Sequence, residues 1–191
     1  MKNIFLILVC ISVSFNVLAE SSRQKDSHEH GAAILKMALE GEKLQIEFEV
    51  PSESLIGFEH FPKSQSNREN FSDAIKILSD PSRLFSMSSK AECLLVGMSI
   101  SQSLFSNEEE HGHDESEEEH GHDESEKSEI HSEFKSNYSW NCHHLDEINS
   151  IGTQLMTFFP KIEEIRVNWI SNNGQGALEL ESKEDRIKGW K

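Results

Sequence analysis

Apolar and polar residues alternate over much of the chain that follows residue 31. Every second position is apolar in residues 33–39 and again in residues 44–50. This period of two is typical of strands with one buried face. Glu40-Gly41-Glu42 lies between the two runs, so we predict a β-hairpin that Pro51 closes, followed by a short helical turn at 52–57.

Two later segments have apolar residues at the three-to-four-residue spacing of a helix. The first precedes Pro81 and the second precedes Pro160, and we expect each proline to end its helix. The apolar positions of the first are Phe71, Ala74, Ile75 and Leu78, and those of the second are Leu145, Ile148, Ile151, Leu155 and Phe159.

Three further segments have strand patterns. Residues 93–100 are mostly apolar and predict a buried strand, whereas residues 134–142 carry Phe134, Tyr138, Trp140 and Cys142 on one parity. Residues 165–180 alternate on both sides of Asn172-Asn173-Gly174, which is a strong hairpin signal.

A hairpin, a helix and another strand are thus predicted on each side of residues 107–130. The predicted class is α+β, as a single domain (20–191) of two similar halves built from β-hairpins with packed helices. Residues 107–130 have almost no apolar side chains, so we expect a disordered His/Asp/Glu-rich insertion there.

The N-terminal residues 1–19 have the pattern of a signal peptide. Lys2 precedes an apolar run over 4–13, and Val17-Leu18-Ala19 is a suitable cleavage site. The run is too short to span a bilayer. We therefore expect an exported protein whose mature chain is not inserted in a membrane.

The acidity of the chain is concentrated in its insertion. The net charge is -16, and twelve acidic residues lie between Asn107 and Glu129 against Lys127 alone. This distribution argues against nucleic acid or an anionic membrane as a partner, and it attracts cations.

The same insertion contains two copies of a nine-residue unit, each beginning His-Gly-His and followed by carboxylates. Imidazole nitrogens suit zinc, copper, nickel or iron. The repeats therefore predict auxiliary metal binding by His111, His113, His120 and His122. A purely solvated acidic spacer is the alternative.

Four other histidines lie near predicted strand starts or turns. His28 and His30 share one face of an extended chain before the first strand, His60 follows a turn, and His131 opens the second half. If the halves pack together, these four meet, and zinc sites commonly use three or four histidine nitrogens. Any one of them alone is more often a solvated or capping strand-end residue, and Glu59 is more readily a supporting or surface carboxylate than a ligand.

Two cysteines remain after the leader, Cys93 and Cys142, and they flank the insertion. In an oxidising compartment such a pair favours a disulfide, which we expect to staple the ends of the insertion to the core. Zinc thiolates are the alternative, although no second cysteine lies near either one.

Several segments together resemble the ZrgA-type periplasmic zinc-uptake proteins of Gram-negative bacteria. They are His28-Glu29-His30-Gly31, Pro51-Ser-Glu-Ser-Leu-Ile-Gly57-Phe-Glu-His60, His131-Ser-Glu-Phe134 and Tyr138-Ser-Trp140-Asn-Cys142, around a His/Asp/Glu-rich insertion. The resemblance covers nearly the whole mature chain, and its most specific parts are Gly-Phe-Glu-His and His-x-His-Gly.

The resemblance implies a periplasmic protein that binds Zn²⁺ and supports an ABC-type zinc importer or its binding protein. It implies His30, His60 and His131 as ligands, His28 as the fourth, and Glu59 as their support. A periplasmic buffer or metallochaperone is the alternative function. A zinc-dependent hydrolase is disfavoured, because the sequence has no His-Glu-x-x-His helix and no nucleophile elbow. We therefore expect no enzymatic activity.

Overall fold

The computed structural model describes residues 31–104 and 131–191. The predicted leader (1–19), His28, His30 and the predicted disordered insertion (107–130), with its four histidines, lie outside the described residues. These predictions are therefore not tested by the fold.

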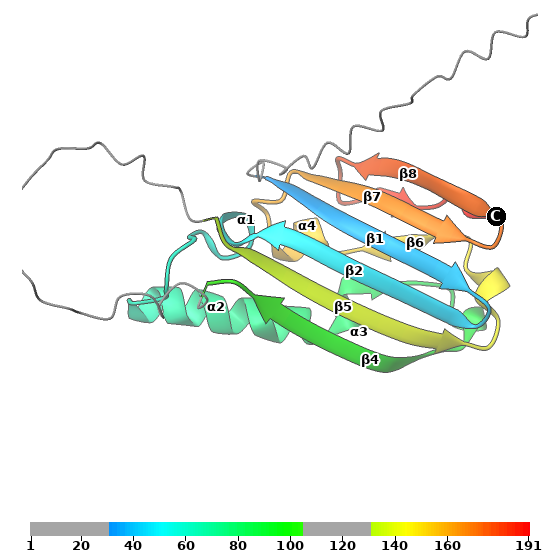
Figure 1. Cartoon of the computed structure of the whole chain (residues 1–191), viewed down its shortest axis with the longest axis horizontal. Helices are drawn as coiled ribbons and strands as arrows, with labels where there is room; N and C mark the ends of the chain where they lie inside the picture. The colour runs from blue at the N-terminus through cyan, green and yellow to red at the C-terminus, as the bar shows by residue number, and fades with distance from the viewer. Residues whose placement is uncertain (1–30, 105–130) are drawn as a thin grey trace, which may run out of the picture.

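One six-stranded sheet forms the centre of the molecule, with the order β4-β5-β2-β1-β7-β8 (Figure 1). Neighbouring strands are antiparallel except β1 and β7, which are parallel. Strands from both sides of the insertion therefore belong to one sheet, in which β5 lies between β4 and β2. The strands are β1 (Ala32–Glu40), β2 (Lys43–Pro51), β4 (Cys93–Gln102), β5 (Glu133–Cys142), β7 (Glu164–Ser171) and β8 (Gly174–Leu180).

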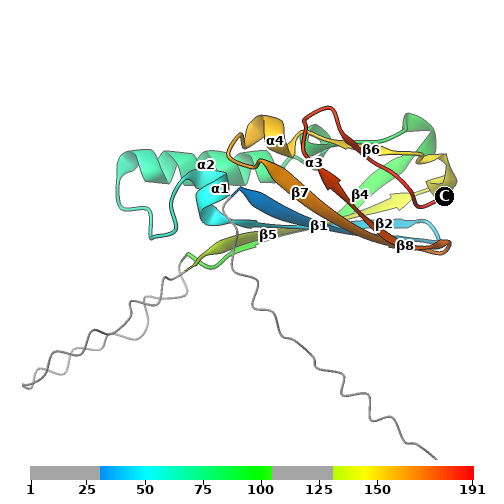
Figure 2. The same cartoon turned by 90° about the horizontal axis from the view of Figure 1, so that it is seen from above.

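Among the described residues, a second layer covers one face of this sheet and no element covers the other, open face (Figure 2). It contains a three-stranded sheet of β3 (Phe85–Ser86), β6 (Ile151–Thr153) and β9 (Arg186–Ile187). Its helices are α1 (Ser52–Ile56), α2 (Gln65–Leu78), α3 (Pro81–Leu84) and α4 (Leu155–Phe158), with single turns η1 (Ser89–Ala91) and η2 (Leu145–Glu147). Within the described ranges, no helix is long and apolar enough to cross a bilayer.

The core lies between the two layers, and the period-two positions of the strands fill it. Leu35, Phe48 and Phe134 are fully buried. Tyr138 is buried as well, and its hydroxyl donates to the carbonyl of Leu78 at 2.8 Å, which ties β5 to the end of α2. Burial raises the pKa of Tyr138 to about 12, against a smaller opposing effect of Ser136.

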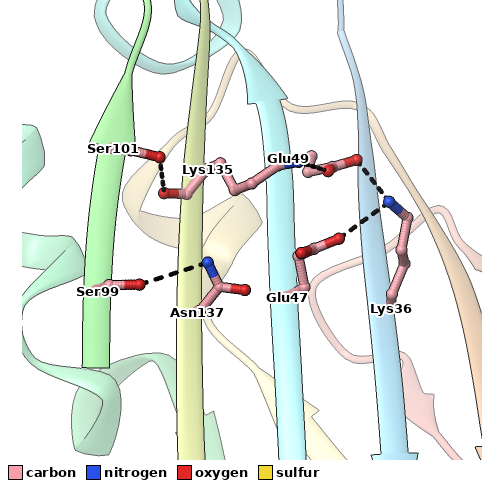
Figure 3. A network of polar contacts seen from close by, with 7 residues as sticks. All are labelled: Lys36, Glu47, Glu49, Ser99, Ser101, Lys135 and Asn137. Carbon is pink, nitrogen blue, oxygen red and sulfur yellow. Dashed lines mark hydrogen bonds and ion pairs between the residues drawn. The ribbon is translucent and has the colours of Figure 1, made fainter. Parts of the chain in front are cut away.

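The open face carries the alternate, polar positions of the same strands (Figure 3). Lys36 Nζ lies 3.0 Å from Glu47 Oε1 and 2.9 Å from Glu49 Oε2, and Lys135 pairs with the other oxygen of Glu49. Partial burial raises the pKa of Glu49, but hydrogen bonds from Lys135 and Lys36 outweigh it and hold that pKa below its ordinary value. The pairing explains how acidic residues line a sheet face that water contacts.

The α+β class and most of the predicted elements are confirmed. Both hairpins form, the helical turn at 52–57 is α1, and residues 134–142 fall in β5. The first predicted helix is α2, which begins at Gln65, where the Ser64 side chain accepts from the N–H of Asn67 at 3.0 Å.

The predicted helix over residues 145–159 is wrong, so the two halves differ in their helices. The segment forms η2, β6 and the short α4 instead. Asn149, Ser150 and Gly152 are weak helix formers at its centre. Gly152 also lies against β3 and β9, where a Cβ would come within 2.6 Å of Ser86 Oγ and of an Arg186 nitrogen. Ile148, Ile151, Leu155 and Phe159 are buried and Leu145 is half-buried, but they do not belong to one helix.

The prediction that residues 93–100 form a buried strand is half wrong. The strand exists, but β4 is the last strand of the sheet, and Leu94 and Val96 are 66% and 67% exposed. An apolar run in the sequence identifies a strand, but it does not tell whether that strand lies inside the sheet or at its edge.

Candidate metal centre

Helix α1 is the point at which two distant parts of the chain are held together. The N–H of Ser52 donates to the carbonyl of Ser132 at 2.8 Å, and the N–H of Gly31 donates to Ser54 Oγ at 2.9 Å. Both α1 serines are buried. The residues that directly follow His30 and His131 are therefore fixed to one helical turn.

Gly57 ends α1 and directs the chain toward Glu59. It has φ of 89°, a left-handed conformation that favours glycine, and its N–H donates to the carbonyl of Glu53 at 3.0 Å. The chain then passes Phe58, which is buried, and reaches Glu59 and His60.

Glu59 and His131 contact each other across the sequence. Nδ1 of His131 lies 3.3 Å from Glu59 Oε2, and the hydroxyl of Ser132 donates to the Glu59 carbonyl at 3.4 Å. Because the carboxylate accepts, a neutral His131 ring carries its proton on Nδ1 and its lone pair on Nε2. A carboxylate that orients a histidine in this way is a recurrent feature of zinc sites.

His60 has the same arrangement of its ring nitrogens. Its Nδ1 donates to the carbonyl of Phe61 at 2.8 Å, and its ring stacks on Phe58 with 5.0 Å between the centroids. The neutral ring therefore also carries its lone pair on Nε2, the form in which imidazole binds a metal.

The second carboxylate oxygen of Glu59 has an unusual environment. Oε1 is buried and has no hydrogen-bond partner among the described residues, although the side chain as a whole is 18% exposed. A buried oxygen of this kind costs free energy unless something compensates it. A cation bound near Glu59 and His131 would supply that compensation, so the donor set fits a metal ion.

The structure brings one predicted ligand, His131, into contact with its predicted supporting residue, Glu59. His60 is next to Glu59 in the chain. In residues 31–104 and 131–191, however, no group of three or more His, Cys, Asp or Glu side chains is placed to hold a metal ion. A complete site needs ligands from elsewhere, and the predicted ones, His28 and His30, lie outside these ranges.

The predicted disulfide is present, and it excludes the alternative of zinc thiolates. Cys93 and Cys142 are bonded, face each other in the β4–β5 ladder and have Cα atoms 3.9 Å apart. The expectation that the bond staples the ends of the insertion is wrong, because it lies at the opposite end of that ladder. The insertion's ends are held instead by the Ser103 N–H, which donates to the Glu133 carbonyl at 3.1 Å, and by the Glu133 N–H, which donates to Ser103 Oγ at 2.9 Å.

Sequence reasoning missed the serines that organise this end of the molecule. Ser52, Ser54 and Ser132 are buried polar residues whose partners lie far away in the chain. The segment Pro51-Ser-Glu-Ser predicted a helical turn, but the sequence carried no signal for which strands that turn would join.

Comparison with known proteins adds one finding. A family model described as "ZrgA family zinc uptake protein" matches residues 27–189. The match includes Glu59, His60 and His131 and both disulfide cysteines. No curated protein matches the chain.

Proposed function

The chain belongs to the ZrgA family of zinc uptake proteins, and from this premise we propose that it captures Zn²⁺ in the periplasm and supports uptake through an ABC-type importer. Zinc is the cargo in this account. The folded domain holds one ion tightly, and the acidic insertion gathers ions around it.

The observation that carries the proposal is the contact between Glu59 and His131. It orients one imidazole with Nε2 as the metal-binding nitrogen, and it leaves a buried carboxylate oxygen without a partner among the described residues. His60 lies next in the chain with the same nitrogen available. The proposed ligands are His60 and His131, completed by His28 and His30, with Glu59 as the orienting group.

The anchoring of Gly31 supports His28 and His30 as the missing ligands. Gly31 is hydrogen-bonded to Ser54 of α1. His30 directly precedes Gly31 in the chain, so the Cα atoms of His30 and Gly31 are about 3.8 Å apart. The leader-side histidines are thereby tethered to the same helical turn that holds Ser132, the neighbour of His131.

The insertion acts as the collector. Its acidic residues raise the local cation concentration, and His111, His113, His120 and His122 chelate zinc more weakly than the folded domain does. The chain re-enters the fold at His131, so a collected ion is released beside the tighter site.

Export to the periplasm is supported by two features. Residues 1–19 have the signal-peptide pattern, and a disulfide such as Cys93–Cys142 persists in oxidising compartments.

We propose binding and delivery rather than catalysis. A hydrolase would need a general base beside metal-bound water, and Glu59 Oε2 is instead engaged with His131. Hydrolytic activity that disappears on chelation and returns with zinc would contradict this assignment.

Growth under zinc starvation tests the function. A strain without the gene, and without its other zinc-capture proteins, should grow poorly and be rescued by the wild type but not by His131→Ala. His143→Ala is the matched control, since His143 is exposed and lies beside Cys142 at the other end of β5. Normal growth without the gene would favour the periplasmic buffer or metallochaperone.

A further inference from the structure

Exposed apolar side chains gather on strand β4. Four of the six large apolar side chains exposed in the described residues belong to it: Leu94, Leu95, Val96 and Met98, at 66%, 44%, 67% and 44%. They follow one another closely at the disulfide end of the strand. Contiguous exposed apolar residues of this kind mark interaction surfaces more often than single ones do.

The backbone of β4 is also open to a partner strand. On one side β4 pairs with β5, and on the other it pairs with no strand of the described ranges (Figure 1). The N–H of Ser103 donates to the carbonyl of Glu133 in β5. Along an antiparallel strand, the backbone N–H and C=O groups of successive residues point alternately toward one neighbouring strand and away from it. Gln102, Ile100 and Met98 therefore direct their N–H and C=O groups outward.

The opposite edge of the sheet is protected, and β4 is not. Strand β8 contains Glu179 and two glycines, and β9 packs against it. Among the ten residues of β4 there is no charged residue and no proline, and one register shift between Leu95 and Gly97 is its one irregularity. Exposed edges without charges or prolines readily pair with another strand.

We propose that β4 is the pairing edge of a homodimer, in which β4 of a second copy adds in antiparallel orientation about a two-fold axis. Charge does not oppose a second copy at this place. The ten residues of β4 carry no charge, so pairing two β4 strands places no like charges opposite each other.

The side chains of β4 also suit pairing with themselves. A two-fold axis at Met98 places Met98 opposite its own copy and Val96 opposite Ile100, so these opposed pairs are apolar. Gly97 then lies opposite Ser99, a small and uncharged pair. The two six-stranded sheets then become continuous. This proposal does not depend on the zinc site.

The affinity should be modest. One strand edge and a few apolar side chains make an interface at the small end of the known range, so we expect a dissociation constant of about 1–100 µM.

Sedimentation equilibrium of the purified full mature chain over about 1–500 µM tests the proposal, with EDTA present to remove zinc-bridged species. We expect a monomer–dimer equilibrium that Val96→Lys weakens at least about tenfold. Ile170→Lys is the matched control, because Ile170 is 55% exposed but lies on the interior strand β7. Circular dichroism checks that both variants fold.

Amide hydrogen exchange of the unmodified chain gives an independent readout. Protection of Met98 and Ile100 should rise with protein concentration, while that of β8 should not. A monomer at every concentration, a dimer that EDTA abolishes, or a dimer that Val96→Lys and Ile170→Lys affect equally would each overturn the proposal.

Discussion

The two ends of the β4–β5 ladder are built in opposite ways. At one end the Cys93–Cys142 bond joins the strands covalently, and the N–H of Cys142 donates to the carbonyl of Glu42 at 2.6 Å. At the other end the chain leaves the sheet after Gln102 and returns at Glu133, beside Glu59 and His131. That end has polar groups that the described part of the fold does not fully satisfy.

The difference separates stability from function. The disulfide at one end lowers the conformational entropy of the unfolded chain, and this stabilisation does not depend on the contacts at the other end. The end with Glu59 can therefore contain a buried carboxylate oxygen that has no partner among the described residues, which costs stability. We propose that a cation uses this oxygen. Changes at the disulfide end should alter folding, and changes at the Glu59 end should alter zinc binding.

The largest expected effect is on stability, at the disulfide end. Replacing Cys93 and Cys142 together by alanine should lower the free energy of unfolding by about 2–5 kcal/mol, because the bond closes a loop with a sequence separation of 49. Urea unfolding measures it. At temperatures where the variant is folded, zinc affinity should be unchanged. A large loss of zinc affinity in the folded variant would show that the two ends are not independent.

The next effect is on zinc, at the other end. His131→Ala should weaken zinc binding by at least about 100-fold, since it removes a proposed ligand. The unfolding free energy of the zinc-free protein should change by less than about 1 kcal/mol, because His131 is a partly exposed residue (36%). Isothermal titration with a competing chelator measures the affinity, and His143→Ala should leave it unchanged.

Glu59→Gln should have a smaller effect that distinguishes positioning from structure. The amide orients His131 less well, and we expect a loss of about tenfold in zinc affinity. Without zinc the variant should be no less stable than the wild type, because the charge shared by the buried, unpartnered Oε1 is removed. Lower stability with unchanged zinc affinity would make Glu59 a structural residue.

The fold was predictable where the local pattern decides the structure. The period of two identified β1 and β2 because each strand has one buried face, and the Asn172-Asn173-Gly174 turn fixed the second hairpin. The helix expected at 145–159 failed because pairing of β6 with β3 and β9 decides that segment, and those partners lie far away in the sequence.

The candidate site was predictable only where local sequence identifies its residues. Residue type and position suggested His60 and His131, and the contact between Glu59 and His131 spans 72 positions that no periodicity reports. The burial of β4 was misjudged because the number of its neighbours is a property of the whole sheet.

The smallest expected effect lies on the open sheet face. Glu49→Gln should cost about 0.5–1 kcal/mol at pH 7, since Glu49 pairs with Lys36 and Lys135. The pKa of Glu49 is lowered, so its stabilisation is complete above the ordinary carboxyl range and is lost as the pH falls through the folded-state pKa. Unfolding curves of wild type and variant should therefore converge in acid. A difference that persists at pH 2 would mean that the charge of Glu49 is not its cause.

Zinc stoichiometry of a chain that lacks residues 108–129 tests whether the folded domain itself holds an ion at Glu59 and His131. Native mass spectrometry after removal of loosely bound metal should find one Zn²⁺ per folded chain, and none when His131→Ala is added to the same deletion. If the deletion chain holds no zinc, or if it holds one ion with and without His131, the site at Glu59 and His131 does not exist.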